Sequence, residues 1–343
     1  MVKINKWISM MMILSLAVVV GCSSSNTNEG NAAGNNNEGG NEVITLKAAH
    51  YFQPGHPWDM GLEFFAEKVS ELSEGQLQVE IFNNGVLGSE TDMLQNLREG
   101  TLDFAVSDPA AGSTFAKELD FFALPFLFDS YEHWQQTLDG EPGQKYAEII
   151  SEKADLKILG YWGGSSRNVL STDKPIQSME DLKGFKLRLV QSPLKVNVWQ
   201  AVGTIPTPIA YLETYSALQS GTVDGMENES VAVVSMKFYE PAPHITRTEH
   251  EYTVRPLFMS NKTFTSLSPE LQEIVQQAAA EASVYEREVE LEAGVKAEKE
   301  MEDLGVTFYT IDKEPFREVT SPILADFAEE MELTDIFEQI KQN

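Results

Sequence analysis

Residues 43–82 read VITLKAAHYFQPGHPWDMGLEFFAEKVSELSEGQLQVEIF, and this stretch contains the signals that decide the fold. It begins with a β-rich run at 43–49. Apolar residues then recur at helical spacing from Trp58 to Leu72, until Glu74 and Gly75 interrupt the pattern. A second β-rich run follows at 77–82. The order strand, helix, strand predicts an α/β protein.

The same alternation continues along the chain. A helix is expected at 90–98, ended by Gly100, and strands are expected at 104–107, 157–161, 186–190 and 306–310. The sequence GGSS at 163–166 lacks the lysine of a phosphate-binding loop, and its composition predicts a turn.

One predicted helix is unusually long. Ser268, Pro269 and Glu270 have the residue types of a helix start, namely a cap, a proline at the first position and an acid in the first turn. Apart from Gly294, no strong helix breaker follows until Gly305. A helix of this length could brace two lobes, or it could form a dimer seam.

The first 42 residues have the composition of a targeting segment and a linker. Residues 1–21 carry two lysines and a short apolar run, which predicts a lipoprotein signal peptide ending at the sequence VVGC. Cys22, the only cysteine, is the expected lipid attachment site, which anchors the protein to the membrane. Residues 22–42 are rich in Ser, Asn and Gly and are expected to form a disordered tether. The alternative, a buried structural cysteine, is disfavoured because the polar segment after it offers nothing to bury it.

The charge of the chain restricts its partners. The formal net charge is −28, which argues against nucleic acid as a partner and against docking on anionic lipid headgroups. An anionic ligand would need a few local arginines to hold it, with salt screening the general repulsion.

No motif in the chain predicts catalysis. The five histidines show no H-E-x-x-H spacing, and no glycine-rich loop matches a phosphate-binding motif. His50 and His56 flank Pro54 and Gly55, but two histidines without nearby acids are more often loop or cleft residues than metal ligands. We therefore expect neither an enzyme, nor a metal site, nor a cofactor.

Three blocks in the middle of the chain, and three shorter ones outside them, carry a family resemblance. They are LKGFKLRLV (182–190), AVGTIPTP (201–208), ETYSALQSGTVDGMEN (213–228), NGVLGSE (84–90), LPFLF (124–128) and TEH (248–250). The sequences of these blocks, and their order and spacing along the chain, resemble those of the solute-binding proteins of tripartite, ATP-independent (TRAP) transporters, the DctP family. The resemblance covers nearly all of residues 43–330.

The resemblance implies a two-lobed fold like that of periplasmic binding proteins, with a ligand cleft between the lobes and a long bracing helix. By the same resemblance, one lobe is expected to comprise residues 43–165 plus 254–292. The other is expected to comprise residues 166–253 plus 293–343.

The resemblance also assigns ligand-binding residues. Arg188 matches the family arginine that pairs with the ligand carboxylate, a role that suits the planar, two-pronged guanidinium. Without the resemblance, the alternation Leu187-Arg188-Leu189 favours the interpretation that Arg188 is an exposed residue on an edge strand, because most arginines are exposed.

Further candidates come from the family and from topology. Arg167 matches a second family arginine, although the residues before it, Ser165 and Ser166, depart from the family pattern. Asn228 matches an asparagine that bonds the ligand, with Glu229 in place of a frequent proline.

Weaker assignments complete the expected site. Glu90 would accept hydrogen bonds from ligand hydroxyls or would simply stabilise its helix, and Tyr211 matches an aromatic cleft position or is a core aromatic. Phe52 and Gln53 follow the first strand, where ligands of α/β proteins bind, and Trp162 and Gln191 are weaker candidates of the same kind.

The resemblance implies a receptor outside the cytoplasm that delivers a small organic acid to a TRAP membrane permease. Polar residues at the expected site favour a sugar acid such as a uronate as the ligand. A four-carbon dicarboxylate is the alternative ligand, and a chemosensory ligand-binding subunit is the alternative role.

Overall fold

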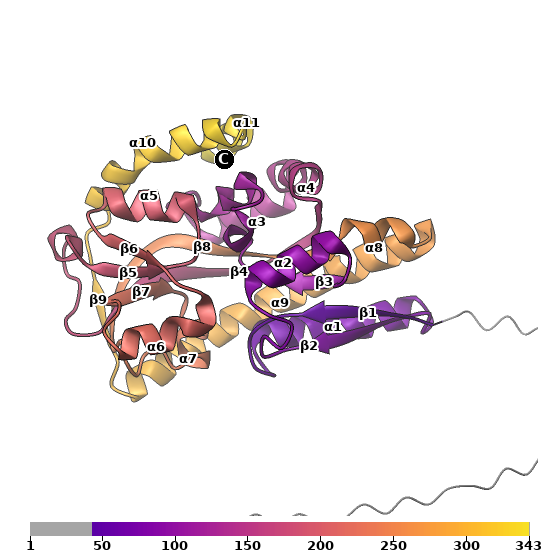
Figure 1. The fold of residues 1–343 in the computed structure, drawn as a ribbon, viewed down its shortest axis with the longest axis horizontal. Helices are drawn as coiled ribbons and strands as arrows, with labels where there is room; N and C mark the ends of the chain where they lie inside the picture. Colours follow the sequence, from indigo (N-terminus) through magenta and orange to yellow (C-terminus); the bar gives the residue numbers. More distant parts are fainter. Residues whose placement is uncertain (1–42, 343) are drawn as a thin grey trace, which may run out of the picture. The chain divides into compact units, whose positions relative to one another are not determined.

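The computed structural model describes residues 43–342. The predicted signal peptide, Cys22 and the tether at 22–42 lie outside the described residues. Figure 1 shows the arrangement of the described elements.

A mixed sheet forms the centre of the fold. Its order is β2-β1-β3-β8-β4-β7-β5-β6, and β9 pairs with β8. The β3/β8, β4/β8 and β4/β7 pairs are antiparallel, and the remaining pairs are parallel. The strands are β1 (Ile44–Ala49), β2 (Leu77–Phe82), β3 (Phe104–Val106), β4 (Leu156–Ser171), β5 (Lys186–Leu189), β6 (Ile205–Pro208), β7 (Gly225–Asn228), β8 (His244–Ser260) and β9 (Thr307–Thr310).

Two long strands join the ends of this sheet. β4 has 16 residues and β8 has 17, and they pair with each other along most of their length. β8 also pairs with β3 at one end and with β9 at the other, while β4 pairs with β7. The residues of both sheet ends are therefore positioned by the same two strands.

The predicted turn at 163–166 is wrong, because these residues lie inside β4. The β4/β8 register shifts between Gly163 and Ser166, which marks a bulge. Gly163 and Gly164 have φ angles of 93° and 98°, a conformation open to glycine at little cost. The glycines thus bend a continuous strand instead of ending it.

Helices cover the sheet (Figure 1). They are α1 (Pro57–Leu72), α2 (Glu90–Glu99), α3 (Tyr131–Asp139), α4 (Glu141–Ala154), α5 (Pro193–Ala201), α6 (Thr214–Gln219), α7 (Ser230–Ser235), α8 (Asn261–Ser266), α9 (Pro269–Asp303), α10 (Glu314–Glu330) and α11 (Thr334–Gln342). Among the helices between residues 43 and 342, none is both long and apolar enough to span a bilayer.

The long predicted helix is confirmed as α9, which has 35 residues. Ser268 caps it by accepting a hydrogen bond from the Leu271 amide, with Pro269 in the first turn. α9 packs against α1, β4 and α7, so it contacts elements from both ends of the sheet, as Figure 1 shows. Within the described residues it therefore braces the fold.

Local signals also placed the first elements correctly. α1 begins after His56, whose Nδ1 accepts a hydrogen bond from the Trp58 amide and thereby caps the helix. The other histidine of this loop, His50, lies 3.1 Å from Asp59 through Nε2. α2 begins with a capping box at Ser89 and ends at Gly100 in the left-handed conformation.

Candidate functional site

Charged side chains gather in the interior of the fold, where β8, β4, β7 and β5 lie next to one another in the sheet. The buried charged residues of these strands, of α2, of α5 and of the adjoining loops are Glu90, Asp108, Arg167, Arg188, Lys195, Glu227, Glu229, Glu251 and Arg255. We call this set the charged cluster.

Arg167, on β4, is held almost entirely by the protein itself. Its Nε and Nη2 bond both carboxylate oxygens of Glu227, and Nη2 also donates to the Glu227 carbonyl oxygen at 2.9 Å. Nη1 donates to Glu229 at 3.0 Å. Four of the five N–H groups of the Arg167 guanidinium thus donate to groups of the chain itself. Arg167 therefore holds the cluster together and has one N–H group left for a ligand.

Lys195 extends this ion network from α5. Its ammonium group bonds Glu251 and lies 3.8 Å from Glu227. Burial alone would raise the pKa of Glu227, but Arg167 and Lys195 outweigh that effect and hold it well below its ordinary value. The Glu227 carboxylate therefore stays ionised.

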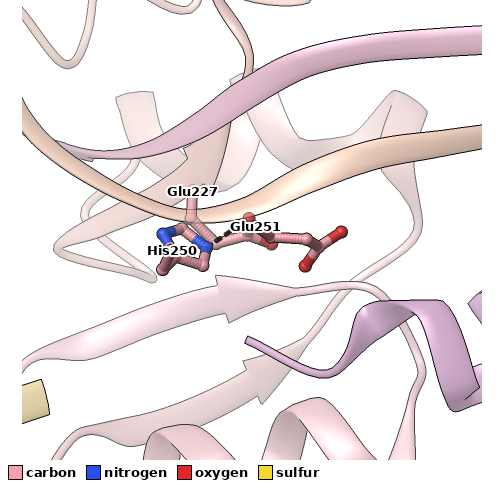
Figure 2. A group of neighbouring side chains, drawn as sticks. All are labelled: Glu227, His250 and Glu251. Atoms are coloured by element: carbon pink, nitrogen blue, oxygen red, sulfur yellow. Dashed lines mark hydrogen bonds and ion pairs between the residues drawn. The ribbon is translucent and has the colours of Figure 1, made fainter. Parts of the chain in front are cut away.

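Figure 2 shows the neighbouring side chains of Glu227, His250 and Glu251. Their possible metal-ligand atoms all lie within 4.8 Å of one another. His250 Nε2 lies 3.3 Å from Glu227. Both carboxylates of the group are also bonded to the cations Arg167 and Lys195. Because a metal ion would have to compete with these two fixed positive charges, the group fits an ion network better than a metal centre.

Arg188, on β5, differs sharply from Arg167. It is 2% exposed, and its Nε and Nη2 both donate to the Ile209 carbonyl oxygen, at 3.0 and 2.7 Å. Among residues 43–342, no carboxylate oxygen lies within 4.0 Å of its guanidinium nitrogens. Burial lowers its pKa, although Glu227 and Glu90 act in the opposite direction. A buried guanidinium without a carboxylate partner is costly, and it would gain from an anion brought in from outside.

Aromatic and amide groups surround Arg188. Its guanidinium carbon lies 5.5 Å from the centre of the Tyr211 ring. The Tyr211 hydroxyl accepts a hydrogen bond from the Asn228 amide at 3.1 Å, and Tyr51 packs against the Tyr211 ring at 4.8 Å. The structure thus brings together three predicted site residues: Arg188, Tyr211 and Asn228.

Glu90 lies at the first position of α2 and is 7% exposed. Its Oε1 accepts a hydrogen bond from the Asp108 amide at 3.0 Å and a long one from the Ser107 hydroxyl at 3.5 Å. Burial and the charge of Asp108 raise the pKa of Glu90 to about 7, against the opposing effects of the Asp108 amide, Arg255 and Arg188. Within the described range, no cationic nitrogen lies within 4.0 Å of its carboxylate.

Four other candidates lie at different kinds of position. Phe52 is fully buried and stacks on the His56 ring at 3.5 Å, so it contributes to an aromatic cluster. Trp162 is also buried, and its Nε1 donates to Ser283. Gln53 and Gln191 are exposed and lie outside the charged cluster.

Six members of the charged cluster were not predicted as site residues: Asp108, Lys195, Glu227, Glu229, Glu251 and Arg255. Arg255, on β8, lies 3.3 Å from Asp108 and 3.8 Å from Glu229, and its Nε has no hydrogen-bond partner in the described part of the chain. It stands between Val254 and Pro256, two apolar residues of β8, as Arg188 stands between Leu187 and Leu189 of β5. An arginine between apolar strand residues was therefore the available signal.

Two buried carboxyl groups connect α9 to the bulge in β4. Glu286 accepts a hydrogen bond from the Gly163 amide at 2.9 Å, and Glu290, one turn later, accepts one from the Ser165 hydroxyl at 2.6 Å. Burial and then Glu229 raise the pKa of Glu290 to about 7, and burial and then Glu290 raise the pKa of Glu286 well above its usual range. Both carboxyl groups therefore favour their own protonated form, at the place where α9 packs against β4.

Comparisons with known proteins agree on one family. Residues 48–330 match the family described as bacterial extracellular solute-binding protein, family 7 (DctP). A solute-binding protein of Sulfitobacter sp. (strain NAS-14.1) is 37% identical over 300 residues, which cover 86% of this chain and 90% of that protein.

Solved structures give the same result. A TRAP periplasmic solute-binding protein of Sulfitobacter sp. NAS-14.1 with bound β-D-galacturonate superposes with a TM-score of 0.84 at 30% identity, covering 88% of this chain and 100% of that one. A second, from Chromohalobacter salexigens with bound D-glucuronate, gives a TM-score of 0.83 at 29% identity, covering 87% and 99%. These structures have the two-lobed fold that the sequence predicted.

Proposed function

The chain belongs to the DctP family of TRAP solute-binding proteins, and from that membership we propose that it is a receptor for a sugar acid, with a uronate as the best fit. Proteins of this family bind solutes and are not enzymes. The proposal therefore concerns which solute is held and how.

The observation that carries the proposal is Arg188, a buried arginine with no carboxylate of the described chain within 4.0 Å. A ligand carboxylate would supply the missing charge, and the planar guanidinium would fix its orientation. Bonds to Ile209 hold the guanidinium in place before the ligand arrives. Less of the binding free energy is then lost in ordering it.

Polar groups around Arg188 support a hydroxylated acid over a plain dicarboxylate. Asn228 and Tyr211 offer an amide and a hydroxyl, and Glu90 offers a carboxyl group that can hydrogen-bond to hydroxyls. A second carboxylate on the ligand would enter a region that already holds Asp108 and Glu229. Like charges at short range oppose binding, so the dicarboxylate remains the weaker candidate. The bound uronates of the two solved relatives also support this choice.

A thermal-shift screen of residues 43–343 tests the proposal. The panel consists of D-galacturonate, D-glucuronate, D-galactonate, succinate and L-malate, with D-galactose as the matched sugar without a carboxylate. A ligand at one hundred times its Kd adds about 2.7 kcal/mol to the free energy of unfolding. Stabilisation by a sugar acid and not by galactose is expected. Stabilisation by the dicarboxylates alone would favour the alternative ligand, and no response to any acid would reject an acid receptor.

The proposed setting is outside the cytoplasm, with lipid at Cys22 anchoring the protein and a TRAP permease receiving the ligand. The sequence VVGC before the polar segment supports the anchor. Substitution Cys22→Ser in the full chain should release the protein from the membrane or leave its signal segment uncleaved. A variant that is processed and membrane-bound like the wild type would reject lipid attachment at this residue. Adjacent genes for a large and a small membrane subunit would support transport, whereas a lone sensor-kinase gene would support the chemosensory role.

A further inference from the structure

Two opposite charges in the cluster each lack a direct partner. Arg188 has no carboxylate within 4.0 Å, and Glu90 has no cationic nitrogen within 4.0 Å, among residues 43–342. Both are buried, at 2% and 7% exposure. They are not in contact, but they are close enough for each to act on the charge of the other.

The two oxygens of Glu90 have different surroundings. Oε1 accepts the hydrogen bonds from Asp108 and Ser107, whereas Oε2 accepts none from any described residue. A proton on Oε2 would therefore leave the bonds of Oε1 intact. It would also give that oxygen a hydrogen to donate.

Burial and the groups around Glu90 determine whether it holds that proton. Burial is the largest effect and disfavours the ionised carboxylate, as does the charge of Asp108 in the loop after β3, whereas the Asp108 amide, Arg255 on β8 and Arg188 on β5 favour it. Tyr51 and Tyr211, both neutral at pH 7, complete its surroundings. The balance leaves the pKa of the free carboxyl at about 7.

A bound carboxylate changes this balance in one direction. It would neutralise Arg188, one of the two cations that favour the ionised form of Glu90, and it would add a negative charge of its own. Water would also leave the site, which strengthens every remaining interaction between charges. Each of these effects favours protonation of Glu90.

We propose that the site takes up a proton when it captures a sugar acid, and that the proton resides on Oε2 of Glu90. The inference rests on the proposed function. The proton comes from solvent, and no bond of the ligand is made or broken. Ligand and proton together add no net charge to the buried cluster, and the protonated carboxyl can donate a hydrogen bond to a ligand hydroxyl.

Calorimetric titration of the wild-type protein with D-galacturonate tests the proposal. At pH 7.5, titrations in phosphate, HEPES and Tris differ in buffer ionisation enthalpy, and the dependence of the observed enthalpy on it gives the number of protons exchanged. Uptake of about half a proton or more per ligand is expected. Affinity should be constant well below pH 7, where Glu90 is already protonated, and should fall above pH 7 by up to about tenfold per pH unit.

Substitution Glu90→Gln assigns the proton. Glutamine keeps the shape and a donor group but cannot ionise, so proton uptake should vanish and the affinity should become constant from pH 6 to pH 8.5. The matched control is Glu99→Gln on the same helix, where the carboxylate is exposed and the wild-type dependence should remain.

The outcomes separate the two proposals. Tight binding of galacturonate by the wild type without proton uptake overturns the proton linkage and leaves the sugar-acid receptor standing. Proton uptake that persists in Glu90→Gln overturns the assignment to Glu90. If galacturonate, glucuronate and galactonate all fail to bind the wild type, the proposed function and the inference built on it are both rejected.

Discussion

Arg167 and Arg188 lie buried in the same charged cluster, but only Arg167 is paired with carboxylates. Arg167 bonds Glu227 and Glu229, whereas the hydrogen bonds of the Arg188 side chain within residues 43–342 go only to the Ile209 carbonyl oxygen. The two residues should therefore respond in opposite ways to loss of their charge.

Substitution Arg188→Met should abolish ligand binding without destabilising the free protein. Methionine fills a similar volume and removes a buried charge that has no carboxylate partner. The free energy of unfolding should stay equal or rise by up to about 2 kcal/mol in urea titrations. A clear loss of stability would show that Arg188 is structural.

Substitution Arg188→Lys should weaken ligand binding, because lysine keeps the positive charge but loses the paired donors of the planar guanidinium. A charged hydrogen bond contributes about 1.5 to 3 kcal/mol, so the affinity should fall roughly ten- to over a hundredfold.

Substitution Arg167→Met should destabilise the protein even without ligand. It leaves Glu227 and Glu229 buried with fewer cations, and breaking one side of a buried ion pair costs about 3 to 5 kcal/mol. Urea titration beside Arg188→Met makes the comparison, since both changes remove a buried guanidinium. Equal stability of the two variants would contradict the difference in pairing described above.

Substitution Tyr211→Phe should weaken binding moderately and leave the fold intact. The ring still packs on Tyr51, but the Asn228 amide loses the hydroxyl that accepts its hydrogen bond. A lost hydrogen bond of this kind costs about 1 to 3 kcal/mol, or roughly five- to more than a hundredfold in Kd. Tyr215→Phe is the control, because the Tyr215 hydroxyl bonds the exposed part of Glu240. A loss of affinity in the control equal to that in Tyr211→Phe would remove the specific role of Tyr211.

Substitution Glu290→Gln should stabilise the protein increasingly as the pH rises. The folded protein holds the pKa of Glu290 at about 7, above its unfolded value, so the unfolded state loses the proton first. Wild-type stability should therefore fall between about pH 4.5 and pH 7 because of this group, and the penalty should persist at higher pH. The advantage of the variant should be small at pH 5 and reach roughly 1 to 3 kcal/mol at pH 8. Glu288→Gln, at an exposed position of α9, should show no such trend in urea titrations. An advantage that does not change with pH would contradict the protonated state of Glu290.

The sequence predicted the elements whose signals are local. The periodic apolar pattern before Glu74, the cap at Ser268 and the glycine at position 100 sufficed for α1, α9 and α2. The length of β4 could not be predicted in this way. Gly163 and Gly164 have the composition of a turn, but pairing with β8 keeps the strand continuous through them. Tertiary contact there overrides local preference.

The site was less predictable because its pairs are distant in sequence. Arg188 was assigned by family resemblance, since alternation alone suggested an exposed residue. The partners of Arg167 lie 60 and 62 residues away, and Lys195 is 56 residues from Glu251. No local pattern encodes which buried arginine is neutralised within the chain and which is left without a carboxylate.

The two long strands also determine the order in which the protein can be assembled. β3 and β4 form early in the chain, but the strand between them in the sheet, β8, ends at Ser260. Phe104 pairs with Met259, and Leu156 pairs with Ser260. Strand pairs this far apart in sequence form slowly, because the chain loses the entropy of closing a long loop before the contacts between the strands stabilise it. A fragment that stops before residue 254 lacks the part of β8 that pairs with β3, so β3 and β4 cannot be joined in one sheet through β8. Arg167, which lies near Glu251, reaches its final neighbours only after most of the chain has been synthesised.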